Sequence, residues 1–307
     1  MSALRAFDVR VSAVRRLSPT YQRVTFAGPS LADFHDGGPL GSRDLRVKLM
    51  LPHVSGAELP DLSELTEGWY QRWLALPPEV RGSMRTYTVR RIRGTGAARE
   101  IDIDFVLHLD ERGRGGPASA WAAGARVGDP LTILGPRATT EHYGGITWHP
   151  PSASRRHPVR VLLAGDETAV PAIGAVLATL GEDCYGHAVL EVPHPEDFQD
   201  LHTPADLEVV WLARGRQPHG DRLVPTVHAL AQVPARPSEE LGPEAEDEVL
   251  WDVPEPTAAA APRFLAWTAG EAAMVRRLRA GLGQGGGLGR GQAAYMGYWR
   301  RGRAEAG

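Results

Sequence analysis

The segment VRVLLAGDETAVPAI (residues 159–173) places a continuous apolar run directly before a helical pattern. Such a run is typical of a parallel strand that is buried on both faces of a sheet. We expect the helix over residues 169–180, with Thr168 capping its start. Ligands of α/β folds bind at the carboxyl ends of the strands. The turn that holds Gly165, Asp166 and Thr168 is therefore a candidate cofactor site.

The alternation of strand and helix continues towards the end of the chain. Apolar runs occur at 188–192, 207–212 and 264–270, and helical patterns occur near 221–231 and 271–282. This alternation predicts an open, parallel α/β sheet with right-handed crossovers. Gly270 and Glu271 repeat the strand-to-helix turn and join the candidate site. The stretch 234–262 interrupts the pattern, and we expect a long surface excursion there with Trp251 as its anchor.

The first half of the chain has a different pattern. Short segments of alternating polarity, broken by Gly and Pro, occur at 7–17, 21–28, 45–51 and 101–109. Such segments predict an antiparallel β-barrel. Residues 62–82 have helical spacing and predict one helical excursion between the strands. In 101–109 the apolar residues predict a core face, and the alternating Asp102 and Asp104 predict a face open to solvent or ligand. We therefore expect a β-barrel domain at 1–150 and a parallel α/β domain at 151–307.

Composition limits the function. A chain of 307 residues corresponds to about two domains, and a net charge of −3 argues against nucleic acid as a partner. The single cysteine, Cys184, excludes an internal disulfide and an iron–sulfur cluster. No apolar stretch reaches the ~18 residues of a membrane span, and the first residues show no signal-peptide core, so we expect a cytoplasmic protein without membrane insertion.

Two motifs in the first half could bind a cofactor. In RTYTVR (85–90), Arg85 and Tyr87 share one face of a strand, and they suit a pyrophosphate and a planar heterocycle. An ordinary amphipathic strand is the alternative.

In GGPASAWA (115–122), Gly116, Pro117, Ala118 and Ser119 form a helix start with little side-chain bulk. Its free amides would attract an anion. The alternative is a plain turn into a helix. His108 precedes this turn on the expected ligand-facing side, although a lone histidine is usually structural.

Hydrolytic chemistry has no support in the sequence. The Walker A, HEXXH and GxSxG patterns are absent. Any redox chemistry would therefore use a bound organic cofactor or a metal that is held by ligands other than cysteine thiolates.

The chain resembles the siderophore-interacting flavoprotein family, a branch of the ferredoxin–NADP reductase superfamily. The resemblance rests on seven motifs in order: MRTYTVR (84–90), IDIDFVLH (101–108), GPASAWA (117–123), LGPR (134–137), AGDETAVPAI (164–173), TAGE (268–271) and MGYWRRG (296–302). It implies an FAD-binding barrel and an α/β domain that binds NADPH or NADH.

The resemblance also implies residue roles in the barrel domain. Arg85 would neutralise the FAD pyrophosphate, Tyr87 would stack on the isoalloxazine, and Thr88 would lie near its redox-active edge. The turn from Gly116 to Ser119 would supply amides to the pyrophosphate, and His108 would contact the flavin.

In the α/β domain the resemblance assigns the donor to the two strand-to-helix turns named above. Asp166 and Glu167 would turn away from phosphate or contact ribose or nicotinamide. Arg214, with Arg216, could hold the 2′-phosphate of NADPH. Tyr298 and Trp299 either lie near the flavin or simply finish the sheet.

The implied activity is reduction of ferric siderophores by NAD(P)H through FAD. Because the flavin carries the chemistry and the substrate brings its own iron ligands, we expect no catalytic side chain and no protein metal site. Because these substrates are often anionic, Lys48, Arg46 and Arg137 are candidates for binding them. Lys48 is the only lysine. A flavin oxidoreductase with another acceptor and a non-catalytic siderophore-binding flavoprotein are the alternatives. A reduced ferredoxin stays open as donor, and we expect a monomer.

Overall fold

The computed structural model describes residues 4–38, 41–53, 59–62, 65–110, 112–140, 143–151, 156–232, 250–254, 263–285, 288–289 and 291–302. The chain folds into two compact units, with the change from the first to the second at Ile146 and Thr147.

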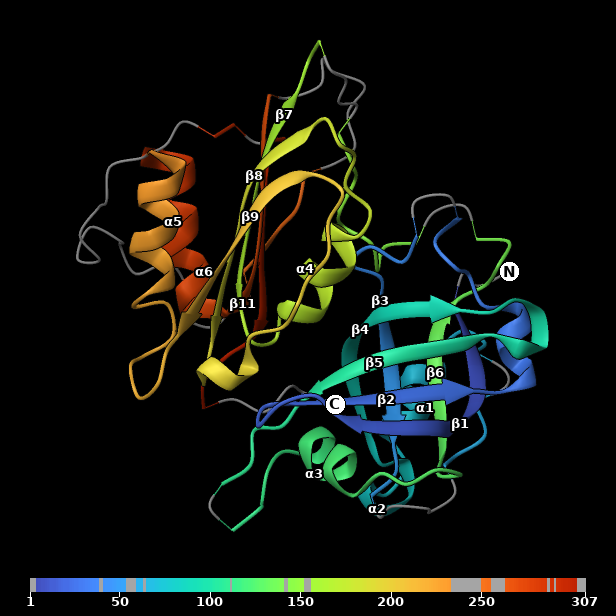
Figure 1. Cartoon of the computed structure of the whole chain (residues 1–307). Helices are drawn as coiled ribbons and strands as arrows, with labels where there is room; N and C mark the ends of the chain where they lie inside the picture. Colours follow the sequence, from blue (N-terminus) through green and yellow to red (C-terminus); the bar gives the residue numbers. More distant parts are fainter. Residues whose placement is uncertain are drawn as a thin grey trace. The chain divides into compact units, whose positions relative to one another are not determined.

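The first unit is a closed antiparallel barrel with the strand order β1-β2-β5-β4-β3-β6, so the predicted barrel is confirmed (Figure 1). Its elements are β1 (Leu4–Arg16), β2 (Tyr21–Ala27), η1 (Pro29–Asp33), β3 (Arg46–Leu51), α1 (Trp69–Leu74), α2 (Pro78–Arg81), β4 (Ser83–Arg93), η3 (Gly96–Ala98), β5 (Glu100–Val106), α3 (Pro117–Gly124) and β6 (Pro130–Pro136). Alternate residues of β1, namely Phe7, Val9 and Val11, are at most 3% exposed, as the period of two requires.

Helices pack against the barrel at two places. From α3, Trp121 packs against Phe26 and Phe105 in the barrel core, with ring centroids 6.1 and 5.5 Å apart. The predicted excursion at 62–82 contains two short helices instead of one, because Pro78 starts a second helix, where its fixed φ is favourable. In the first of them Trp73 is buried in a second apolar cluster, with Met50 of β3.

The second unit is an open sheet with the order β10-β12-β11-β7-β8-β9. Its elements are β7 (Val159–Asp166), α4 (Val170–Leu177), β8 (Cys184–Val192), η4 (Pro195–Asp197), β9 (Asp206–Ala213), α5 (Leu223–Ala231), β10 (Trp251–Asp252), β11 (Phe264–Glu271), α6 (Ala272–Arg279), the π-helix η6 (Ala280–Gly285) and β12 (Ala293–Trp299). The strands are parallel as predicted, except that the short β10 pairs antiparallel with β12.

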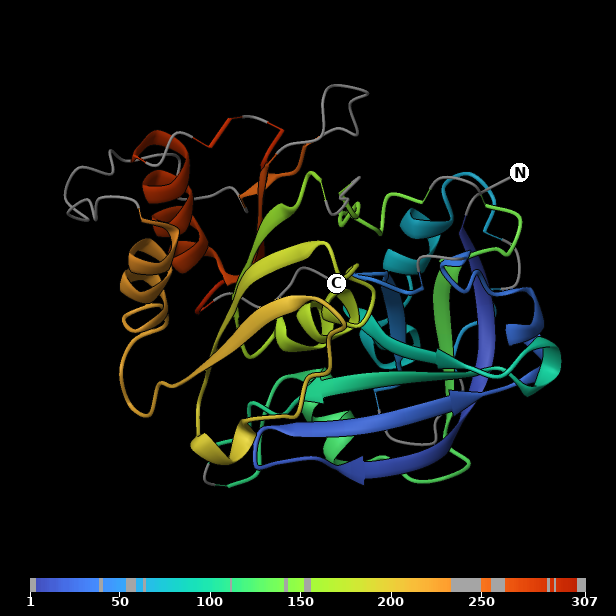
Figure 2. The same ribbon diagram turned by 45° about the horizontal axis from the view of Figure 1, so that its top comes forward.

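Helices cover both faces of this sheet. Figures 1 and 2 show α5 and α6 together on one face and α4 on the other. Leu223, Val227 and Leu278 of α5 and α6 are fully buried against Leu162 and Val189 of the sheet. Because the long strands are parallel, the ends of β7, β8, β9, β11 and β12 meet at one carboxyl edge, where the candidate donor site was expected.

Part of the predicted surface excursion lies outside the described residues. Its acidic portion is in 233–249, and a further part is in 255–262. Within 250–254, Trp251 is 46% exposed and stacks on Tyr298 of β12, with ring centroids 6.2 Å apart. No helix in the described part of the chain combines the length and apolarity that crossing a membrane requires.

Candidate functional site

Strand β4 carries the first predicted cofactor residues. Its register against β3 pairs Arg85 with Leu49 and Tyr87 with Val47. Arg85 and Tyr87 therefore lie on the same face of the sheet as these two core residues. Both are half-buried, and Arg85 Nη1 donates to the Met84 carbonyl at 2.8 Å. This face of β4 therefore presents a guanidinium and an aromatic ring together.

Thr88 lies on the opposite face of β4 from Tyr87. It is paired with Arg46 across the strands and is 6% exposed. The predicted place of Thr88 at the flavin edge stays a prediction.

The start of α3 combines close packing with open space. A Cβ on Gly115 would lie 2.4 Å from the His108 carbonyl oxygen, whereas a Cβ on Gly116 would meet no atom within 4 Å. Gly116 is the N-cap, Pro117 is the first helical residue, and no side chain caps the helix. The amides of the next two residues, Ala118 and Ser119, have no helical carbonyl to bind. An anion can therefore approach this helix start.

The hydroxyl of Ser119 fixes the loop before α3. Its Oγ accepts the His108 backbone N–H at 3.1 Å and donates to the Val106 carbonyl at 3.0 Å. The hydroxyl is thus used within the protein, which leaves the backbone amide for a ligand. The His108 side chain is exposed.

An aromatic row joins the two motifs. The ring of Tyr87 lies 4.5 Å from that of Phe105, which lies 5.5 Å from that of Trp121 on α3. Tyr87 of β4 and Ala118 at the start of α3 thus belong to one apolar cluster, and Arg85 shares the strand face of Tyr87. FAD contains a diphosphate and a planar ring, and these residues fit both parts.

The predicted substrate cations occupy neighbouring strands. Lys48 and Arg46 share a face of β3. Lys48 Nζ donates to Thr86 Oγ1 at 2.6 Å, and Arg46 donates to the carbonyls of residues 144 and 145 at 3.1 and 3.2 Å. Arg46 therefore also holds a loop. Arg137 follows β6, whose register against β3 places it near the Arg46 end.

The polar face of β5 differs from the prediction. Asp102 and Asp104 are only 1% and 2% exposed, so the expected open face is wrong. Asp104 accepts two hydrogen bonds from Arg23 at 2.6 and 2.7 Å, and Asp102 pairs with Arg93. The arginines of the neighbouring strands cover these carboxylates and neutralise them.

Asp166 lies fully buried at the carboxyl edge of the second unit, where it accepts four hydrogen bonds. Oδ1 accepts from the N–H and Oγ1 of Thr168 at 2.9 and 2.6 Å, and Oδ2 accepts from the Glu271 N–H at 2.7 Å and Trp299 Nε1 at 2.9 Å. Burial and the neighbouring charge of Glu167 raise the pKa of Asp166 to about 6.

The turn after β7 differs from the prediction in one respect. Thr168 binds Asp166 and does not cap α4, whose N-cap is Ala169 without a side-chain bond. Two glycines allow the close approach at this edge. A Cβ on Gly165 would lie 2.6 Å from a backbone oxygen of β11, and Gly270, with φ of +140°, would place one 2.6 Å from Asp166 Cγ.

Glu167 and Arg214 form a buried ion pair. Their two hydrogen bonds measure 2.8 and 3.1 Å, and the residues are 0% and 7% exposed. Burial opposes the charge of Arg214, but the bonds and negative charge of Glu167 raise the pKa of Arg214 above its ordinary value. The guanidinium is thus directed at Glu167, and this geometry does not support its predicted contact with a 2′-phosphate. Arg216 is exposed.

Two further carboxylates close helix starts at this edge. Glu191, which the sequence analysis missed, accepts three backbone N–H groups within residues 220–223 at 2.7–3.2 Å. Glu271 accepts two in the first turn of α6 at 2.7 and 3.1 Å. The sequence did contain a sign of this role. Glu191 lies inside the buried apolar run at 188–192, and a buried carboxylate requires a hydrogen-bond partner. The starts of α5 and α6 are therefore already occupied by carboxylates of the protein.

Among the described residues, Asp166, Glu167 and His219 have ligand atoms within 4.8 Å of one another. These oxygens already accept hydrogen bonds from Trp299 and Arg214 among others. A cation would have to displace these donors, so the cluster favours a hydrogen-bonded network over a metal site.

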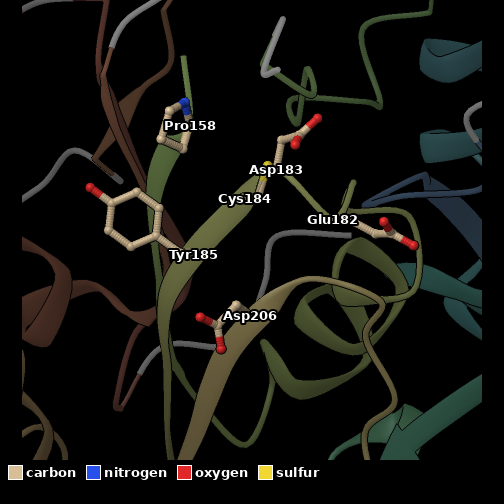
Figure 3. Close-up of a pocket in the computed structure, with 6 residues that line it drawn as sticks. All are labelled: Pro158, Glu182, Asp183, Cys184, Tyr185 and Asp206. Carbon is tan, nitrogen blue, oxygen red and sulfur yellow. The ribbon is translucent and has the colours of Figure 1, made fainter. Parts of the chain in front are cut away.

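A hollow of about 440 Å³ lies at the opposite edge of the sheet (Figure 3). It is lined by Pro158, Glu182, Asp183, Cys184, Tyr185 and Asp206. Three of these residues are acidic and none is basic, which disfavours a phosphate ligand. Burial raises the pKa of the Cys184 thiol, so it stays protonated and is a poor nucleophile.

Two family models match the chain, one for each unit. Residues 10–140 match the siderophore-interacting FAD-binding domain, and residues 158–302 match the siderophore-interacting protein model. The chain belongs to the siderophore-interacting protein family. FAD is accordingly the cofactor of its barrel domain.

Siderophore-interacting proteins of known structure share this fold along nearly the whole chain. A siderophore utilization protein from T. fusca is 28% identical, with a TM-score of 0.69 and coverage of 100% of this chain and 97% of that one.

Curated relatives are similar over shorter regions. An uncharacterized protein of Mycobacterium tuberculosis is 36% identical over 69% of this chain and 66% of its own length. The ferric vibriobactin reductase ViuB of Vibrio cholerae is 32% identical over 64% of this chain and 63% of its own. In both, the match spans less than two thirds of the relative. The NADPH-dependent ferric-chelate reductase of Escherichia coli is 29% identical over 76% and 79%.

Proposed function

We propose that this siderophore-interacting protein reduces the iron of ferric siderophores. It is a flavin oxidoreductase that uses FAD, with NAD(P)H as the electron donor. The observation that carries the proposal is the unobstructed, uncapped start of α3, which belongs to the same apolar cluster as Tyr87 of β4. Relatives named as a ferric vibriobactin reductase and as a ferric-chelate reductase support the substrate class.

The residues of the barrel bind and orient. Arg85 and the amides of Ala118 and Ser119 hold the pyrophosphate, and the Tyr87 ring packs against the isoalloxazine. When bound, FAD accepts two electrons together as a hydride and can release them singly, so one NAD(P)H accounts for two Fe(III) ions reduced to Fe(II). The overall reaction releases one proton to the solvent, and it needs no side chain as a general acid.

Basic side chains recognise the substrate. Lys48, Arg46 and Arg137 attract an anionic ferric chelate. Lys48 donates to Thr86, whereas Arg46 holds the loop at 144–145, so Lys48 is the more available of the two cations on β3. The donor binds at the carboxyl edge, near Gly165 and Gly270. Because NAD(P)H is an intracellular reductant, we place the reaction in the cytoplasm. The protein acts as a monomer in this proposal. A reduced ferredoxin is the alternative electron donor.

The test is the anaerobic visible spectrum of the purified holoprotein. We expect flavin bands that bleach with NADH or NADPH and recover with a ferric siderophore, while a chelator traps Fe(II). Bleaching without recovery would indicate another acceptor. Bound chelate that stays oxidised with both nucleotides and with reduced ferredoxin would indicate a binding protein. Absence of flavin bands after addition of FAD would overturn the proposal.

A pair of variants tests the substrate side. Lys48→Met removes a positive charge and should raise KM for an anionic ferric chelate about tenfold, which is about 1.4 kcal/mol. Lys48→Arg keeps the charge and should have a much smaller effect. Equal KM values for the wild type and Lys48→Met would remove Lys48 from the substrate site.

A further inference from the structure

Trp299 lies at the carboxyl edge of the second unit. It ends β12, where the register pairs it with Glu271 of β11 after an irregularity at Gly270. The residue is half-buried. An indole has one hydrogen-bond donor and a large flat face, and a planar heterocycle can stack on that face.

Asp166 fixes the polar end of this ring. The bond from Trp299 Nε1 to Asp166 Oδ2 is 2.9 Å. The carboxylate is itself held by Thr168 on its other oxygen and by the Glu271 amide. Because the carboxylate is fully buried and accepts bonds on both oxygens, it cannot rotate without breaking several of them.

Glu167 fixes the ring by a second route. His219 Nε2 lies 3.2 Å from Glu167 Oε1, and the His219 ring meets the Trp299 ring edge-on, with centroids 4.9 Å apart and planes at 80°. Glu167 is in turn held by Arg214 through two hydrogen bonds. Two consecutive residues, the last of β7 and the one that follows it, therefore restrain one aromatic side chain, one at its N–H and one through a histidine.

We propose that Asp166 and Glu167 are positioning residues that hold the Trp299 ring against the nicotinamide nucleotide at the carboxyl edge of the sheet. The inference rests on the proposed function, because it takes NAD(P)H to bind at that edge. In this proposal Asp166 acts through Trp299 and does not contact the ribose itself. Both carboxylates face protein donors, which keeps their negative charge away from the phosphates of the nucleotide.

The experiment uses the FAD-loaded full chain, labelled with 5-fluorotryptophan. Trp299→Phe identifies the Trp299 ¹⁹F resonance, and titrations with NADP⁺ and NAD⁺ give the dissociation constants. We expect Asp166→Asn to shift the Trp299 resonance and to weaken binding of the preferred nucleotide about tenfold, as for misplaced positioning groups. Adding Trp299→Phe to Asp166→Asn should cause little further loss, because both changes remove the same bond.

The second route needs a variant that keeps the buried ion pair, since Glu167→Gln removes the charge that binds Arg214 most closely and leaves Glu191, 3.7 Å away, to neutralise it. His219→Leu leaves the pair intact and should also shift the Trp299 resonance. Asp197→Asn is the matched control: Asp197 is fully buried in the same unit and accepts the His194 N–H at 3.0 Å. It should change neither the Trp299 resonance nor nucleotide affinity.

An unmoved Trp299 resonance in both Asp166→Asn and His219→Leu would overturn the inference. Nucleotide affinity that stays unchanged in Asp166→Asn and Trp299→Phe would also overturn it, as would a wild type that binds neither nucleotide. If the wild type binds nucleotide but reduces no ferric chelate, the proposed function fails while the positioning is still measured.

Discussion

At the scale of the residue, the titration of Asp166 has a measurable consequence. Burial and the charge of Glu167 raise the pKa of Asp166 from 3.8 to about 6 in the folded protein. Between these values the folded state binds more protons than the unfolded state. The proton on Asp166 therefore adds to the free energy of unfolding. This contribution is fully present below about pH 4 and is lost as the pH rises through 6.

Asp166→Asn removes this titration, because an amide does not ionise. We expect the free energy of unfolding of the variant, relative to the wild type, to increase from pH 4 to pH 7. Guanidinium unfolding at several pH values measures this difference. A difference that is constant over the range would contradict the raised pKa.

At the scale of the element, the start of α3 gives a matched pair of variants. Gly115→Ala forces a Cβ to 2.4 Å from a backbone oxygen, so it should destabilise the FAD-free protein by about 1–3 kcal/mol. Gly116→Ala places its Cβ in open space and loses only a favourable N-cap residue, about 1 kcal/mol or less.

For FAD affinity the two variants should rank in the opposite order, with Gly116→Ala the more strongly affected. The methyl group of Gly116→Ala occupies the space through which a diphosphate approaches the helix, so FAD affinity should fall about tenfold relative to the wild type. Thermal unfolding without FAD and fluorescence titration with FAD measure the two effects. If Gly116→Ala binds FAD as tightly as the wild type, the helix start is not the pyrophosphate site.

The sequence predicted elements better than their side-chain partners. Alternation in the first half and apolar runs in the second predicted the barrel and the sheet, because burial periodicity is local. Asp102 was expected to face solvent, yet it pairs with Arg93 of a neighbouring strand. The contact of Arg214 with a 2′-phosphate stays a prediction, but its pairing with Glu167, 47 residues away, was not visible in the sequence. Such partners depend on strand register and turn geometry, which a local pattern does not contain.

At the scale of the whole molecule, each unit has its own apolar core and its own candidate ligand site. The barrel core includes Phe105 and Trp121, and the core of the second unit includes Leu162 and Leu278. A ligand that binds only the folded state stabilises it by about 2.7 kcal/mol at 100 times its dissociation constant. The two ligands should therefore protect different parts of the chain.

Hydrogen exchange measured by mass spectrometry can locate this protection. FAD added to the FAD-free protein should slow exchange most at 84–90 and 106–122. NADP⁺ or NAD⁺ added to the FAD-loaded protein should slow it most at 164–171 and 268–274, whose amides lie at the carboxyl edge. The peptides that cover β1 serve as the internal control, because no candidate contact involves them. Protection by FAD that is confined to the second unit would contradict the assignment of the cofactor to the barrel, whereas nucleotide protection confined to the barrel would remove the donor from the edge that Asp166, Glu271 and Trp299 form.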